Sequence, residues 1–70
     1  MPNFLIQASL HKWPGSFDDQ AVRIEISEKA EAANVHEAWR KLDKLIADKK
    51  AQLDKEGFRS RIIWSEVKGV

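Results

Sequence analysis

A single stripe of apolar residues at helical spacing constrains the fold of this chain more than any other feature. Between residues 34 and 53 apolar side chains recur every three or four positions, which is the spacing of one buried helix face. The members of the stripe are Val35, Ala38, Trp39, Leu42, Leu45, Ile46 and Leu53. The pattern predicts one long amphipathic helix that turns this stripe, Trp39 included, toward the core.

Both ends of the predicted helix carry signals that stop it. Asn34, followed three residues later by Glu37, resembles a capping box with asparagine as the N-cap. Extending the helix backwards would put Glu28 on the buried stripe, an unfavourable place for an unpaired carboxylate. Gly57 offers the positive φ that a C-terminal cap requires. We therefore predict a helix from about residue 35 to about residue 56.

Strand patterns flank the helix on both sides. Residues 3–11 alternate between two faces, as in a half-buried strand, and residues 21–31 resume the alternation. Between them, residues 12–20 predict a loop that closes a wide antiparallel hairpin. The side chains of the first strand that share its apolar face are Phe4, Ile6, Ala8 and Leu10.

The pattern of residues 59–67 predicts a third strand, but it does not show which face of that strand meets the helix. The segment is rich in β-branched and aromatic residues, as strands are. Ile62 and Trp64 fall on one face, and Ile63 falls on the other with Val67. A slip of one residue exchanges the two faces, so either can meet the helix. We favour the alternative that turns Trp64 into the core.

The order of these elements predicts an α+β fold of the β-β-α-β type, over residues 1–70 as a single domain. Three antiparallel strands form a sheet, and one long helix packs on one face of it. A right-handed crossover places the third strand beside the first, which gives the strand order 2-1-3. Because a chain of 70 residues has a small core and both outer strands have free edges, we expect a homodimer.

Composition argues against several classes of protein. With no cysteine and two histidines, we expect neither a disulfide framework nor a metal site, and no cofactor. The apolar runs are short, so we expect a soluble cytoplasmic protein without membrane contact. Hydrolytic chemistry needs paired carboxylates or a nucleophile beside a base in a pocket. No such arrangement is recognisable, and we expect no enzyme activity.

The leading functional hypothesis is a small interaction or regulatory protein, of the kind found among bacterial and phage accessory proteins. Trp13 and Phe17 form an aromatic tip on the predicted loop, and exposed tryptophan is common at binding hot spots. Leu5 and Ile63 are placed on the second face of the sheet. We predict that a protein partner binds through a sheet edge or through the Trp13 loop, at Trp13, Phe17, Leu5 and Ile63.

A weak nucleic-acid-binding module is the alternative. The net charge is only +1, but residues 35–70 hold nine basic and six acidic side chains. Basic groups interleaved with aromatic ones on a sheet face are typical of proteins that bind single strands. The candidate residues on the open sheet face are Lys12, Arg23, Arg59 and Arg61.

Overall fold

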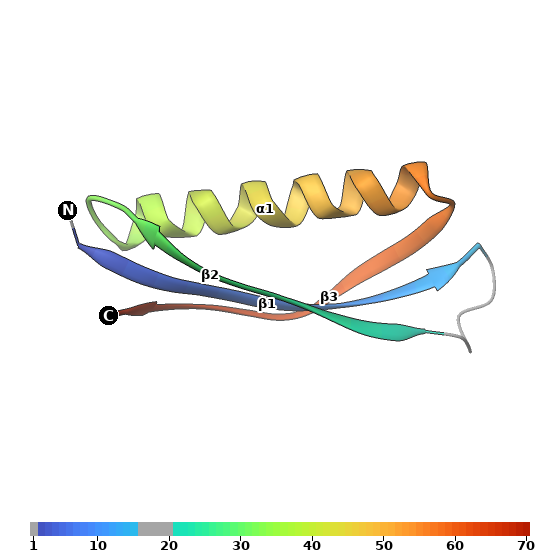
Figure 1. Cartoon of the computed structure of the whole chain (residues 1–70), viewed down its shortest axis with the longest axis horizontal. Helices are drawn as coiled ribbons and strands as arrows, with labels where there is room; N and C mark the ends of the chain where they lie inside the picture. The colour runs from blue at the N-terminus through green and yellow to red at the C-terminus, as the bar shows by residue number, and fades with distance from the viewer. Residues whose placement is uncertain (1, 16–20) are drawn as a thin grey trace.

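The computed structural model describes residues 2–15 and 21–70, and it shows one helix lying along one face of a three-stranded sheet (Figure 1). Helix α1 (Val35–Lys55) connects the second strand to the third. The sheet is antiparallel with the order β2-β1-β3, so the predicted α+β fold and strand order are confirmed. The strands are β1 (Asn3–Pro14), β2 (Val22–Glu31) and β3 (Phe58–Gly69).

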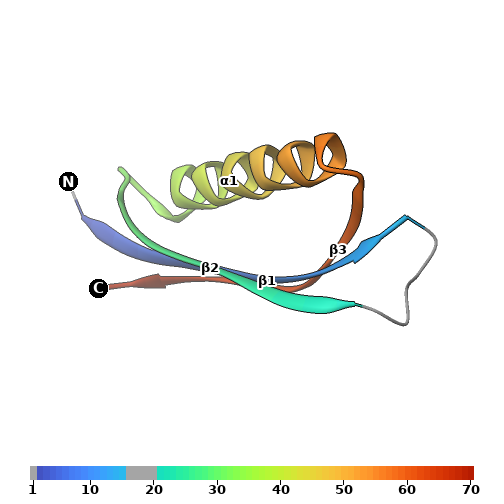
Figure 2. The same cartoon turned by 45° about the vertical axis from the view of Figure 1, so that its right-hand side comes forward.

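Helix α1 packs over β1 and β3 more than over β2. Seen from a second direction, the helix still lies to one side of all three strands (Figure 2). Its buried residues are spaced as the stripe predicts, and the core residues of β1 lie beneath them. The buried side chains of α1 are Ala38, Leu42, Ile46 and Leu53, and those of β1 on this face are Ile6, Ala8 and Leu10.

Two members of the predicted stripe are not core residues. Trp39 is 36% exposed and Val35 is exposed as well. At 100° per residue, Trp39 lies about 60° further round the helix than Leu42. Leu45 lies on the opposite flank, where it borders β2. A sheet of three strands is too narrow to cover both flanks of one helix, so the prediction that Trp39 is a core residue was wrong.

Both helix caps form as the sequence predicts. Asn34 is extended, and its Oδ1 accepts a hydrogen bond of 3.0 Å from the Glu37 backbone N–H. At the other end the backbone N–H of Glu56 donates to the carbonyls of Gln52 and Leu53. Gly57 follows with φ of +84°, a conformation that places a Cβ too close to the backbone for most residues.

Replacing Gly57 with alanine should lower the free energy of unfolding by about 1 to 2 kcal/mol, because alanine is strained at a positive φ. Urea denaturation followed by circular dichroism measures this change. Gly69→Ala is the matched control, since Gly69 has an ordinary φ and open space where the Cβ would lie. Equal losses in the two variants would contradict the role of Gly57 as the helix terminator.

A β-bulge in the third strand decides which side chains face the helix. Ser9 of β1 opposes Trp64, but the next residue, Leu10, opposes Ile62. Ile63 is therefore the extra residue of the bulge. Opposed residues share a face, so Ile62 lies on the face of buried Leu10 and Trp64 lies on the open face, where it is 39% exposed. The prediction that Trp64 turns into the core was wrong. It assumed a continuous strand, in which Ile62 and Trp64 share a face, whereas the bulge places them on opposite faces.

Strand β1 is longer than the sequence predicts. Its pairing with β3 continues through Trp13, which opposes Arg59, to Pro14, which opposes Phe58. Residues 12–14 therefore belong to the strand and not to the predicted loop. Gly15, with φ of +53°, donates its N–H to the carbonyl of Gly57 at 3.2 Å. The remainder of the predicted loop, which includes Phe17, lies outside the described residues.

Candidate binding site on the open sheet face

The face of the sheet opposite α1 carries a cluster of basic and aromatic side chains at one end. In the strand register, His11 of β1 lies between Arg23 of β2 and Arg61 of β3. The adjoining pair on the same face is Trp13 and Arg59. Neighbouring strands are about 4.8 Å apart, so the cluster spans roughly 10 Å across the sheet. We call these five residues the Trp13 site.

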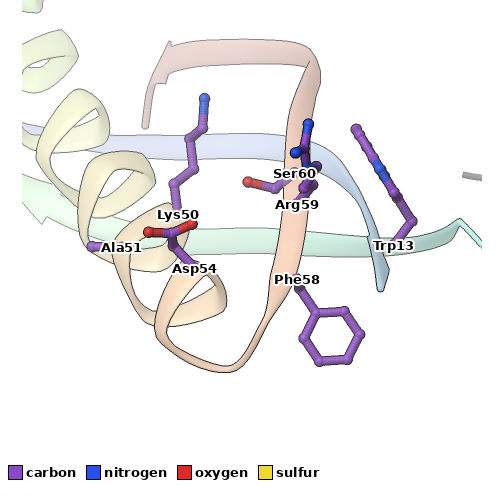
Figure 3. A pocket seen from close by; sticks show the side chains of 7 residues that line it. All are labelled: Trp13, Lys50, Ala51, Asp54, Phe58, Arg59 and Ser60. Carbon is purple, nitrogen blue, oxygen red and sulfur yellow. The ribbon is translucent and has the colours of Figure 1, made fainter. Parts of the chain in front are cut away.

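Two hollows meet at Trp13. The first, of about 350 Å³, is lined by His11, Trp13, Ala21 and Arg61. The second, of about 620 Å³, lies between the end of α1 and the start of β3. Figure 3 shows Lys50 and Asp54 extending from α1 on one side of β3, with Trp13 on the other side. The residues lining this second hollow are Trp13, Lys50, Ala51, Asp54, Phe58, Arg59 and Ser60.

Each hollow therefore combines the indole of Trp13 with a guanidinium group. Arg61 supplies it in the first hollow and Arg59 in the second. Trp13 is half-buried, so part of it stays accessible to a ligand. An accessible aromatic ring can stack a planar group, and a guanidinium beside it can form two parallel hydrogen bonds to an anion.

Arg23 is held in place by its own neighbours. Its Nη2 donates to the Ser9 hydroxyl at 3.1 Å, and its Nε lies 3.4 Å from a carboxylate oxygen of Glu25. Ser9 has no exposed surface although it lies on the open face, where Glu25 opposes it on one side and Trp64 on the other. Within the described ranges, Arg59 and Arg61 form no ion pair. Unlike Arg23, they have no carboxylate partner among the described residues, so their guanidinium groups are available to bind a ligand.

Lys12, the fourth residue of the predicted nucleic-acid set, lies on the other face. Its ammonium sits over the ring of Phe58, 4.7 Å from the centroid. Successive side chains of a strand point to opposite faces, so a residue next to His11 cannot share the open face with it. The structure therefore brings together Arg23, Arg59 and Arg61 and separates Lys12 from them.

The residues predicted to bind a protein partner do not form one patch. Leu5 and Trp13 share the open face but lie eight residues apart on β1, about 26 Å at the rise of an extended strand. Ile63 is 41% exposed at the bulge of β3. Phe17 belongs to the chain outside the described residues. The open face also carries His11 and Trp64, which were not among the residues predicted to bind a partner.

The described residues contain neither a cluster of metal-binding side chains nor a helix that could span a membrane. Among these residues no three His, Asp or Glu side chains gather closely enough to hold a metal ion. Helix α1 is not apolar enough to cross a membrane. The chemistry available at the Trp13 site is stacking and the binding of anions.

Compared with protein-family models, curated proteins and solved structures, the chain matches none of them. The features that indicate a function are therefore the Trp13 site and the free edges of the sheet.

Proposed function

We propose that this protein is a non-enzymatic module that binds single-stranded nucleic acid at the Trp13 site. The observation that carries the proposal is the position of Trp13, whose ring borders two hollows that each present a guanidinium. Proteins that bind single strands stack bases on aromatic rings and hold the phosphates with basic side chains. Arg59 and Arg61 are two residues apart on one strand, about 7 Å, so they can contact a backbone at separate points.

The shape of the site favours single strands over duplexes. Proteins that read a duplex commonly insert a helix into the major groove. Here the arginines and the indole of the Trp13 site come from the strands, and α1 contributes only one wall of the second hollow. The affinity should be low, because Glu25 and Glu66 lie on the same face and pair with Arg23 and Lys68.

Replacing Arg59 and Arg61 together with alanine should weaken binding and flatten its salt dependence. Each phosphate contact to a single strand contributes about 0.7 to the slope of log K against log salt, so the slope should fall by about 1.4. Fluorescence anisotropy of a dye-labelled oligonucleotide measures both quantities. Arg40→Ala, at an exposed position on α1, is the matched control and should bind like the wild type. An unchanged slope in the double variant would contradict the proposal.

A homodimeric module that binds a protein partner is the second candidate. The order β2-β1-β3 leaves the outer edges of β2 and β3 unpaired within the described chain. Around the bulge, Ile62, Ile63 and Trp64 each expose about two fifths of their surface. Because Ile62 and Trp64 lie on opposite faces, the β3 edge itself is the candidate contact surface. Binding to such a partner would resist salt and would depend on Ile63 more than on Arg61. Either function suits a protein of the cytoplasm.

A further inference from the structure

We infer that a second copy of this chain pairs with the outer edge of β2, antiparallel to it, about a two-fold axis through Ser27. The inference rests on the homodimeric candidate above and does not require nucleic-acid binding, although Arg23 belongs both to the Trp13 site and to this edge. It names the edge, the register and the residues that oppose one another across the interface.

The hydrogen bonds at the end of the sheet show which backbone groups of β2 face outward. Asn3 opposes Glu31, and the N–H of Ala32 donates to the carbonyl of Pro2 at 3.1 Å. This bond lies just outside the Asn3–Glu31 pair, which makes that pair the non-hydrogen-bonded kind. The N–H and C=O of Glu31 therefore point away from β1. The Glu31 carbonyl indeed accepts a hydrogen bond from the Lys41 ammonium.

Backbone groups alternate along a strand, so every second residue of β2 shares this outward direction. The register with β1 has no shift along β2, which keeps the alternation intact. The residues whose N–H and C=O face outward are Arg23, Glu25, Ser27, Lys29 and Glu31. Their side chains also lie on the open face, so one set of residues determines both the hydrogen bonds and the side-chain contacts of this edge.

The β2 edge lacks three of the features that keep a free edge from pairing, which are a proline, a bulge and a covering helix. It does carry charged side chains, which are another common protection, so pairing requires a register that places opposite charges across the interface. Strand β2 has ten residues without proline, glycine or a bulge, and α1 lies mainly over β1 and β3. The β3 edge, in contrast, carries the bulge at Ile63. Pairing is therefore expected at β2.

Charge complementarity selects the register centred on Ser27. In this register Arg23 of one copy opposes Glu31 of the other, and Glu25 opposes Lys29. Both contacts occur twice because of the symmetry, and opposite charges across a strand pair are favourable. The adjacent registers bring like charges together. In a register centred on Ile26, Arg23 of one copy opposes Lys29 of the other. In a register centred on Glu28, Glu25 of one copy opposes Glu31 of the other.

The helix-facing side of β2 is compatible with the same register. Ile24 of one copy opposes Ala30 of the other, and both are only half-buried in the single chain. Ile26 opposes Glu28, which borders a hollow also lined by Lys41 and Lys44. The result is a continuous six-stranded sheet with both helices on one face and both Trp13 sites on the other. An interface of one strand on each side is small, so the dimer should be weak.

A cysteine at position 27 tests the register directly. The chain has no cysteine, so Ser27→Cys introduces a single thiol. A hydrogen-bonded pair has a Cα separation of about 5.5 Å, which lies within the range of a disulfide. We expect mild oxidation to convert this variant to a covalent dimer on a non-reducing gel. Glu28→Cys, exposed and one residue along, should stay largely monomeric because it opposes Ile26. Equal cross-linking of the two variants would overturn the register.

A charge exchange tests the dimer without a covalent bond. Lys29→Glu places like charges opposite Glu25 twice, so we expect the dissociation constant to rise roughly tenfold. Adding Glu25→Lys should restore it. Sedimentation equilibrium over a concentration series measures the three proteins. A monomeric wild type would overturn the inference, and so would a double variant whose dimer dissociates as readily as that of Lys29→Glu. Oligonucleotide binding by the wild type is measured separately and tests the Trp13 site.

Discussion

Leu10→Ala should lower the free energy of unfolding by about 2 to 5 kcal/mol, which is most of the stability of a domain of this size. Leu10 has no exposed surface. It lies on the central strand between Ile24 and Ile62, on the face that α1 covers. Truncation leaves a cavity that the surrounding sheet and helix cannot easily fill. Urea denaturation followed by circular dichroism measures the loss.

Ile63→Ala is the control for this prediction. Ile63 is the extra residue of the bulge and is 41% exposed, so its truncation should cost less than about 1 kcal/mol. The contrast also tests the register of the third strand. A strand without the bulge could turn Ile63 toward the helix, and the two substitutions would then cost similar amounts.

Trp13→Ala should weaken the binding of a single-stranded oligonucleotide roughly 10- to 100-fold, since stacking on an aromatic side chain contributes about 1 to 3 kcal/mol per base. Among the described residues, Trp13 carries the one ring that borders both hollows, so its loss removes the stacking surface that they share. Trp13→Phe should retain most of the affinity, because phenylalanine keeps a flat aromatic face. Fluorescence anisotropy at low salt measures all three proteins.

Trp39→Ala is the matched control for the stacking prediction. Trp39 is also a partly exposed tryptophan, but it belongs to α1 on the opposite face of the sheet. Its truncation should leave the affinity for the oligonucleotide unchanged. Circular dichroism establishes that each variant is folded. Equal weakening by Trp39→Ala and Trp13→Ala would show that neither ring is a specific stacking surface.

The architecture could be predicted from the sequence because its periodic patterns agree with one another. The alternation of Ile6, Ala8 and Leu10 fits only a half-buried strand, and Leu42 and Ile46 have the spacing of a helix face. Asn34 and Gly57 mark the helix ends by local chemistry that does not depend on the remainder of the fold. Handedness then settles the strand order.

The sequence did not show which face of the third strand meets the helix. Nothing in the segment Arg61, Ile62, Ile63 and Trp64 signals a bulge. Any uninterrupted alternation puts Ile62 and Trp64 on the same face. The structure separates them by leaving Ile63 unpaired. The exposure of Trp39 was missed for a different reason, since the spacing of a stripe does not reveal how much of it a narrow sheet can cover.

The candidate site was only partly predictable. Arg23 and Arg61 are far apart in sequence and meet at His11 through pairing on both sides of the central strand. That meeting requires the register of both strand pairs, and the bulge in β3 determines one of them. The separation of Lys12 from this set could have been foreseen, because it is adjacent to His11 on an alternating strand.

The salt dependence of binding by the wild-type protein tests the central claim most directly. Anisotropy titrations with a short labelled single-stranded oligonucleotide at several salt concentrations give the slope of log K against log salt. With two or three arginines contacting phosphates, we predict a slope of about −1.5 to −2. No binding at low salt, or a slope near zero, would contradict the assignment of nucleic-acid binding to the Trp13 site.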